Sequence, residues 1–130
     1  MIEIVPPQTT GETLAWISAL ITILFGLICL FAPRTTFAIL RLQTFPDVPE
    51  ALSESRATMS GFYLGTGLFA IILAQPLVWL VLGAGWAFTA FGRLVSMIFD
   101  RGFTVFNLVS IVMEGVLAAM PLLYVFGYVR

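Results

Sequence analysis

The sequence predicts an all-α integral membrane protein, folded as a four-helix bundle in a single domain over residues 1–130. Hydrophobic residues make up 60% of the chain and charged residues 10%, whereas about a quarter of the residues in a soluble domain are charged. The mean hydropathy is +1.05. The few charges leave long uncharged runs, and a helix needs about 20 apolar residues to cross the hydrocarbon of a bilayer. These observations favour a chain that crosses a membrane several times.

The uncharged runs set the order of the spans. The first run, Thr13–Pro33, has the length of one span. The run Ala57–Gly92 is too long for one span, and Gln75-Pro76 divides it, because proline cannot continue a helix interior and restricts the residue before it. The last apolar run is interrupted only by Glu114. The predicted spans are therefore about 13–32, 57–74, 77–99 and 103–128.

Residues at the expected helix ends agree with the first two spans. Thr9 and Glu12 have the spacing of a capping box, which satisfies backbone donors at the start of a helix. Asp47 and Pro49 offer a cap and a first-turn proline. We therefore expect the second helix to begin before the membrane and to enter it at Arg56.

Two further segments depart from a simple span. Residues 34–45 mix arginines with large apolar residues, and we interpret them as a short segment that lies at the membrane interface. In the fourth span, Pro121 removes the backbone donor that would reach the carbonyl of Leu117. We expect this proline to bend the helix about one turn beyond Glu114.

The arginines predict the orientation of the chain. Positive charge is retained on the cytoplasmic side of a membrane. Four arginines belong to the loops that join the first span to the second and the third to the fourth, and the opposite side has Arg130 alone. These membrane-surface basic residues are Arg34, Arg41, Arg56 and Arg101. We therefore expect a multi-pass membrane protein with both termini outside the cytoplasm.

Two polar stripes predict an interior site. Residues three or four positions apart share a helix face, and such a stripe lies near the end of the third helix and another near the start of the fourth. The stripes are Arg93, Ser96 and Asp100, and Asn107, Ser110 and Glu114. The short connection between the helices makes them antiparallel neighbours, and an ionisable group at membrane depth is normally paired. We therefore expect Arg93 and Glu114 to meet, directly or through water, with the other four as polar neighbours.

The interior pair has two interpretations that the sequence leaves open. A charge-assisted hydrogen bond between Arg93 and Glu114 could serve only to fix the register of two helices, since interior polar residues hold membrane helices together. Membrane-embedded ionisable residues are also candidates for a ligand, proton or ion site. The residue types alone do not decide between these interpretations.

Glycine and tryptophan give a second packing signal. Gly61 and Gly65 form a GxxxG pattern at the start of the second span, where small residues let two backbones approach closely. We favour internal packing of the second helix on the third over dimerisation. Trp16 and Trp79 lie near predicted span ends, as interfacial anchors do, whereas Trp86 lies too deep and is expected to pack.

The inventory of residues excludes several functions. The chain has no histidine, and its formal net charge of -1 gives no basic footprint for nucleic acid. A single cysteine, Cys29, cannot form an internal disulfide and is expected to pack. Metal sites of the Cys/His kind are excluded. We expect no catalytic residue set, no metal and no cofactor.

Several motifs in order resemble a family of short bacterial four-span membrane proteins of unknown function, DUF4345. They are the run from Glu54 to Leu68 with its arginine and glycines, Gly92-Arg93-Leu94-Val95-Ser96, Asp100-Arg101-Gly102 and Glu114. The resemblance covers nearly the whole chain from the first helix onward. It implies the same four-span fold in a bacterial inner membrane, with both termini in the periplasm. It also makes Arg56, Arg93, Asp100 and Glu114 the positions that match the family pattern. Some relatives are described as needed for phage infection, which implies an indirect role in building or presenting an envelope component.

Three classes of function remain in view. The favoured one is a non-catalytic inner-membrane accessory or scaffold protein that contacts membrane lipids and either a membrane protein partner or a second copy of itself. The second is a small dimeric proton-coupled transporter built on Glu114, although the adjacent cation of Arg93 counts against it. The third is a lipid-binding or lipid-modifying protein whose loop arginines grip a phosphate headgroup, with Glu54, Asp100 or Glu114 as the candidate bases for catalysis.

Overall fold

The computed structural model describes residues 2–130, and these form helices and connecting turns without any strand. Four continuous helical stretches are long and apolar enough to cross a membrane, which confirms the predicted fold class. The second of them comprises α3, a π-helical turn η1 and α4. The elements are α1 (Thr10–Phe31), α2 (Pro33–Leu40), α3 (Glu50–Glu54), η1 (Ser55–Met59), α4 (Ser60–Leu73), α5 (Pro76–Phe99) and α6 (Val105–Val125).

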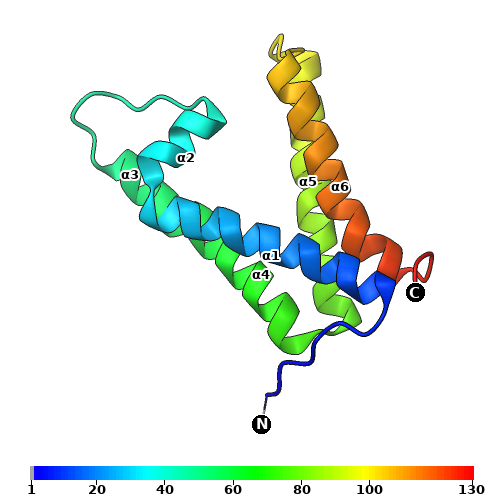
Figure 1. The fold of residues 1–130 in the computed structure, drawn as a ribbon. Coiled ribbons are helices and arrows are strands. Elements are labelled where there is room, and N and C mark those ends of the chain that lie inside the picture. Colours follow the sequence, from blue (N-terminus) through cyan, green and yellow to red (C-terminus); the bar gives the residue numbers. More distant parts are fainter. Residues whose placement is uncertain (1) are drawn as a thin grey trace.

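The long helices form two antiparallel hairpins that cross each other. One hairpin pairs α1 with α4, the other pairs α5 with α6, and α1 also packs on α6. Figure 1 shows the hairpins close together where α1 begins, α4 passes into α5 and α6 ends, and apart where α2 and the α5–α6 turn lie. We call the first side, with both chain termini, the terminal end and the second side the loop end. The second helix therefore packs mainly on the first, and less on the third.

Small side chains of the first hairpin lie in the core of the molecule. Ala15 and Ala19 of α1 and Ala70 of α4 are fully buried, and the large rings of Trp79 and Trp86 pack in the same core. Trp86 packs as expected from its depth. Trp79 was expected to anchor the protein at the interface, and this prediction is wrong because its side chain is buried at the terminal end. The large tryptophan rings and the small alanine side chains together fill this core.

Two prolines leave backbone carbonyls without their helical donors, and in each case a buried serine replaces the donor. Pro121 removes the N–H that would reach Leu117, and Ser18 of α1 donates its hydroxyl to the Leu117 carbonyl over 2.6 Å. Pro33 does the same to Cys29, whose carbonyl accepts from the Ser55 hydroxyl over 2.9 Å. Because an unsatisfied buried carbonyl is costly, these bonds stabilise the contacts of α1 with α6 and with η1.

The prediction that Gly61 and Gly65 allow the second helix to pack closely on the third is wrong. A Cβ atom placed on Gly61 or Gly65 would meet nothing within 4 Å, so neither residue allows a close approach within the chain. The close approaches occur at other glycines. A Cβ on Gly67 would lie 2.7 Å from Ile23 of α1 and 3.1 Å from the Ala19 carbonyl, and one on Gly83 would lie 2.6 Å from Leu122 of α6. These glycines lie at the interfaces within each hairpin.

The helix ends follow the predictions in part. Thr9 accepts from the backbone N–H of Glu12 at 3.2 Å, and the Glu12 carboxylate accepts from the N–H of Gln8 at 2.6 Å, which gives a variant of the expected capping box. The prediction of a cap at Asp47 is wrong. That residue has a φ of 57°, and Pro49 is the N-cap of α3 without a side-chain bond. The second long helix still begins before Arg56, as expected.

Candidate functional site

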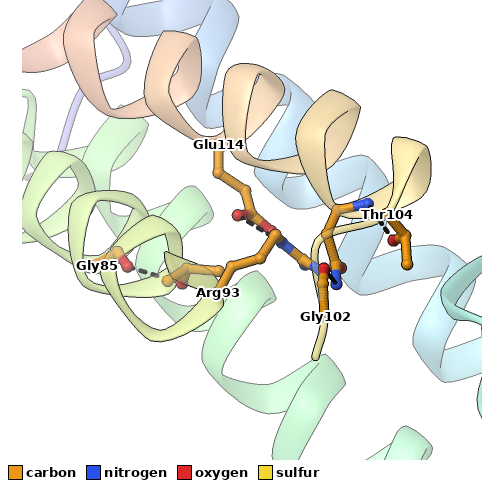
Figure 2. Close-up of polar contacts among 7 residues, drawn as sticks. Gly85, Arg93, Gly102, Thr104 and Glu114 are labelled. Carbon is orange, nitrogen blue, oxygen red and sulfur yellow. Dashed lines mark hydrogen bonds and ion pairs between the residues drawn. The ribbon is translucent and has the colours of Figure 1, made fainter. Parts of the chain in front are cut away.

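The central polar contact joins the two helices of the second hairpin. Nε of Arg93 in α5 donates to both carboxylate oxygens of Glu114 in α6, at 3.0 and 2.9 Å, and Nη2 donates to Oε1 at 2.5 Å (Figure 2). The side chains are 21% and 3% exposed. The predicted pairing of Arg93 with Glu114 is therefore confirmed as a direct, largely buried ion pair. A planar fork on a carboxylate fixes both distance and orientation.

Asn107 links this pair to the turn between the helices. Its Oδ1 accepts from Nη1 of Arg93 at 2.8 Å, and its Nδ2 donates to the Gly102 carbonyl at 2.7 Å. Thr104 caps α6 by accepting from the Asn107 N–H at 3.2 Å (Figure 2). The side chain of Asn107 is thus held at both ends. The turn, the cap and the ion pair form one connected network.

The other members of the two stripes do not join this network. Asp100 is exposed at the C-terminus of α5 and forms no side-chain bond with Arg93 or Glu114, so its assignment to the buried site is wrong. Its position at the helix end leaves its carboxylate in reach of solvent. Ser96 and Ser110 are half-buried and form no side-chain hydrogen bond within residues 2–130. Ser110 faces a cavity one helical turn from Glu114.

A cavity of about 400 Å³ lies between the hairpins toward the loop end, and the ion pair forms part of its wall. We call it the loop-end cavity. Residues of α1, α2, α4, α5 and α6 line it, and most of these side chains are apolar. Its apolar lining includes Phe25, Ile28, Ile39, Leu40, Val109 and Met113. A small number of polar groups in an otherwise apolar cavity is typical of a small-molecule binding site.

Aromatic rings form the inner wall of this cavity. Tyr63 stacks on Trp86 with ring centroids 5.7 Å apart, and Phe25 meets Trp86 edge-on at 5.9 Å. The indole N–H of Trp86 donates to the Thr22 hydroxyl at 2.8 Å, and that hydroxyl donates in turn to the Ser18 carbonyl at 2.7 Å. Trp86 is therefore fixed in place by α1. The Tyr63 hydroxyl has no hydrogen-bond partner within residues 2–130, and its residue lines the cavity.

The loop arginines have different roles in the structure. Arg41, in the left-handed conformation at the end of α2, lies over the ring of Phe106 of α6 at 5.1 Å. It therefore spans the opening between the hairpins, and the guanidinium of Arg93 lies 6.0 Å from the same ring. Arg34 and Arg101 are exposed.

Arg56 is exposed, and it also makes a contact that the sequence did not predict. Its Nη1 donates to the Leu30 carbonyl at 2.6 Å, next to the bond from Ser55 to Cys29. These two bonds satisfy carbonyls in the last turn of α1, which would otherwise lack partners. Arg56 therefore caps the C-terminus of α1. Its charge near a helix C-terminus is also favourable.

Sequence patterns did not single out Tyr63 and Phe106, which line the cavity, or Thr22, which holds Trp86. Their contacts join helices that are distant in the sequence, such as Thr22 with Trp86. A helical stripe identifies residues on one face, but it does not say which face of another helix lies opposite. The aromatic content of the chain, 14%, was the only signal of such a wall.

Comparison with known proteins agrees with the sequence resemblance. A family model described as a domain of unknown function, DUF4345, matches residues 12–126. No curated protein and no solved structure matches the chain. The matched residues run from the first turn of α1 to the end of α6, and they include Arg93, Glu114 and the whole loop-end cavity. The chain therefore belongs to the DUF4345 family.

Proposed function

We propose that this protein is a non-catalytic accessory protein of the bacterial inner membrane, and that it holds one anionic amphiphile in the loop-end cavity in support of envelope assembly. The observation that carries the proposal is the cavity itself, an apolar space of about 400 Å³ with the Arg93–Glu114 pair in its wall and Arg41 beside its opening. Cavities of about 300–1,000 Å³ with few polar groups are typical of ligand sites.

The walls favour an aliphatic chain. Ile39 and Leu40 of α2 line the cavity together with Val109 and Met113 of α6. The rings of Phe25, Tyr63 and Trp86 also line it. Burying apolar surface in such a space is favourable at roughly 25 cal/mol per Å². Lipid tails already surround a membrane protein, so a tail that enters needs no passage through water.

The polar groups favour an acidic headgroup. The bonds of Arg93 to Glu114 and Asn107 use three of its N–H groups, which leaves two of the five that a guanidinium carries. Arg41 has no carboxylate partner within residues 2–130. Phosphate oxygens match both guanidinium groups, because an arginine fork binds phosphate in a bidentate manner.

The same geometry disfavours the transporter hypothesis. Both oxygens of Glu114 accept from Arg93, and a proton or a cationic substrate would have to displace that guanidinium. A paired carboxylate is better suited to holding the arginine in place for a ligand than to cycling between two cations. We also propose that both termini lie in the periplasm. The protein further contacts a membrane protein partner or a second copy of itself. The loop arginines support the orientation.

Native mass spectrometry of the protein released from membranes in mild detergent tests the proposal. We expect a bound anionic lipid on the unmodified chain. Ser110→Trp places a large ring in the cavity and should remove the adduct, whereas Val112→Trp on the same helix faces outward and should keep it. The two variants add the same ring at neighbouring positions.

A second pair of matched variants tests the contact with the headgroup. Arg41 and Arg101 both have left-handed backbones, with φ of 57° and 54°. Arg41→Gln and Arg101→Gln therefore remove the same charge from the same conformation. We expect only Arg41→Gln to weaken lipid retention. Equal adducts in all four variants, or no lipid on the unmodified protein, would refute the proposal.

A further inference from the structure

A second cavity lies at the opposite side of the molecule, at the terminal end. Its volume is about 260 Å³, and its walls come from the extended N-terminal segment, from α1, α5 and α6, and from the end of α4. We call it the terminal-end cavity. Its functional side chains are Glu3, Glu12, Trp16, Trp79 and Tyr124. None of them belongs to the loop-end cavity.

Two carboxylates line the terminal-end cavity, and neither forms an ion pair with a cation among residues 2–130. Glu12 accepts from the Gln8 N–H at 2.6 Å and from the Tyr124 hydroxyl at 3.4 Å, so its position is set by neutral donors. Glu3 forms no hydrogen bond within residues 2–130. The ion pair within those residues is Arg93–Glu114, which lies in the loop-end cavity. The terminal-end cavity therefore has negative charge that the described chain does not neutralise.

Aromatic rings from three helices line the same cavity as these carboxylates. Trp16 belongs to α1, Trp79 to α5 and Tyr124 to α6, and all three line the same cavity. The faces of such rings attract organic cations, and aromatic cages that include tryptophan recognise quaternary ammonium groups. A bare metal ion would gain little from these walls, because it prefers several oxygen ligands.

Trp79 supplies an independent sign of a ligand. Its side chain is 2% exposed, yet its indole N–H has no hydrogen-bond partner within residues 2–130. Every side-chain nitrogen and oxygen in those residues that is closed off from solvent does have a partner. The Trp79 N–H is therefore not fully closed off, and the terminal-end cavity is a space that this residue lines. Indole donates only, so the missing partner is an acceptor atom.

We propose that the terminal-end cavity binds an organic ammonium group that carries an acceptor oxygen a few bonds away, as phosphoethanolamine and phosphocholine do. The ammonium lies among the rings of Trp16 and Tyr124 and faces the carboxylates of Glu3 and Glu12. The acceptor oxygen receives the N–H of Trp79. Either a zwitterionic lipid headgroup or a free small molecule presents this chemistry.

Indole resonances provide the assay, because the chain has three tryptophans and each gives one indole N–H signal. The signal of Trp79 is identified by its loss in Trp79→Phe. Titration of the protein in maltoside micelles with phosphocholine and phosphoethanolamine should shift the Trp79 signal in a saturable manner and leave that of Trp86 in place. Nanodiscs with and without phosphatidylethanolamine form the second arm, and a shift in that arm alone identifies a lipid as the source.

Glu3→Gln is the decisive variant, since Glu3 is exposed and has no hydrogen bond to lose within residues 2–130. We expect affinity to fall about five-fold, the effect of losing a partly exposed ion pair. Glu50→Gln removes the same charge at the loop end, where α3 begins, and should leave affinity unchanged. No saturable shift of Trp79 in either arm, or an equal affinity of Glu3→Gln and Glu50→Gln, would overturn the proposal. Neither result depends on the loop-end cavity.

Discussion

The hydroxyl of Ser18 in α1 donates to the carbonyl of Leu117 in α6 over 2.6 Å, and this bond ties the two hairpins together where they cross. The bond exists because Pro121 cannot supply the backbone donor. The proline and the serine therefore act as a unit although they lie on different helices. The same relationship joins Ser55 to Cys29 next to Pro33.

Ser18→Ala should lower the free energy of unfolding by about 1–3 kcal/mol, because it leaves a buried carbonyl without a donor. Adding Pro121→Ala should recover part of the loss, since an alanine in place of the proline restores the helical N–H. Ser53→Ala, which removes a weak bond at an exposed position, is the control. Unfolding in mixed micelles measures all three, and a double variant no more stable than Ser18→Ala would contradict the pairing of serine with proline.

Arg93→Ala should destabilise the protein by about 3 kcal/mol or more, because it leaves the carboxylate of Glu114 buried without its cation. Arg93→Ala combined with Glu114→Gln should be more stable than the single variant, since no isolated charge remains. The double-mutant cycle in the same micelles gives the coupling energy. Purely additive effects would mean that the contact contributes nothing.

Gly67→Ala should destabilise the first hairpin by about 1–3 kcal/mol, because its Cβ would press against Ile23 and the Ala19 carbonyl. Gly61→Ala and Gly65→Ala have open space around them and should be neutral or gain up to about 1 kcal/mol from helix propensity. Thermal unfolding in detergent compares the three variants. Destabilisation by Gly61→Ala in a monomeric sample would be the contrary result.

Thr22→Val should loosen the inner wall of the loop-end cavity. The change keeps the shape of the side chain but removes the acceptor for the Trp86 N–H, at a cost of about 1–3 kcal/mol. We expect an upfield shift and faster hydrogen exchange of the Trp86 indole N–H by NMR. Thr89→Val, whose hydroxyl bonds only within its own helix at an exposed position, should leave that signal unchanged.

The orientation is tested by labelling single cysteines in a Cys29→Ser background. Arg130→Cys should react with a membrane-impermeant maleimide from the periplasmic side, because both termini are expected there. Thr44→Cys, in the exposed connection between α2 and α3, should react only after permeabilisation. The reverse pattern would invert the proposed topology.

The sequence predicted those features that depend on local chemistry. Uncharged runs and Gln75-Pro76 gave four spans, and α5 begins at Pro76 as a proline at the first helical position favours. The contact of Arg93 with Glu114 followed from antiparallel neighbours joined by a short turn and from the cost of an unpaired charge in a membrane. Pro121 correctly indicated a carbonyl in need of a donor.

The contacts that the sequence did not predict correctly depend on which faces of the helices pack together. Gly61 and Gly67 are both glycines on one helix, and only the position of α1 decides which of them is crowded. Asp100 shares a stripe with Arg93, but α5 ends there and the side chain turns to solvent. The place of Arg56 in the chain predicted an exposed position, but it did not reveal the bond to the end of α1. Helix periodicity alone does not predict how the two hairpins cross.

Because the hairpins cross, they are close together at one side of the molecule and apart at the other (Figure 1). The hairpins are joined by Gln75-Pro76 and by the Ser18–Leu117 bond near one side, and their other ends diverge (Figure 1). A helix the length of α5 is about 36 Å long, so a rotation of roughly 5° at the joined side moves the free tip by roughly 3 Å. A small change in the tilt of one hairpin would therefore produce a larger change in the separation of the helices near Arg41.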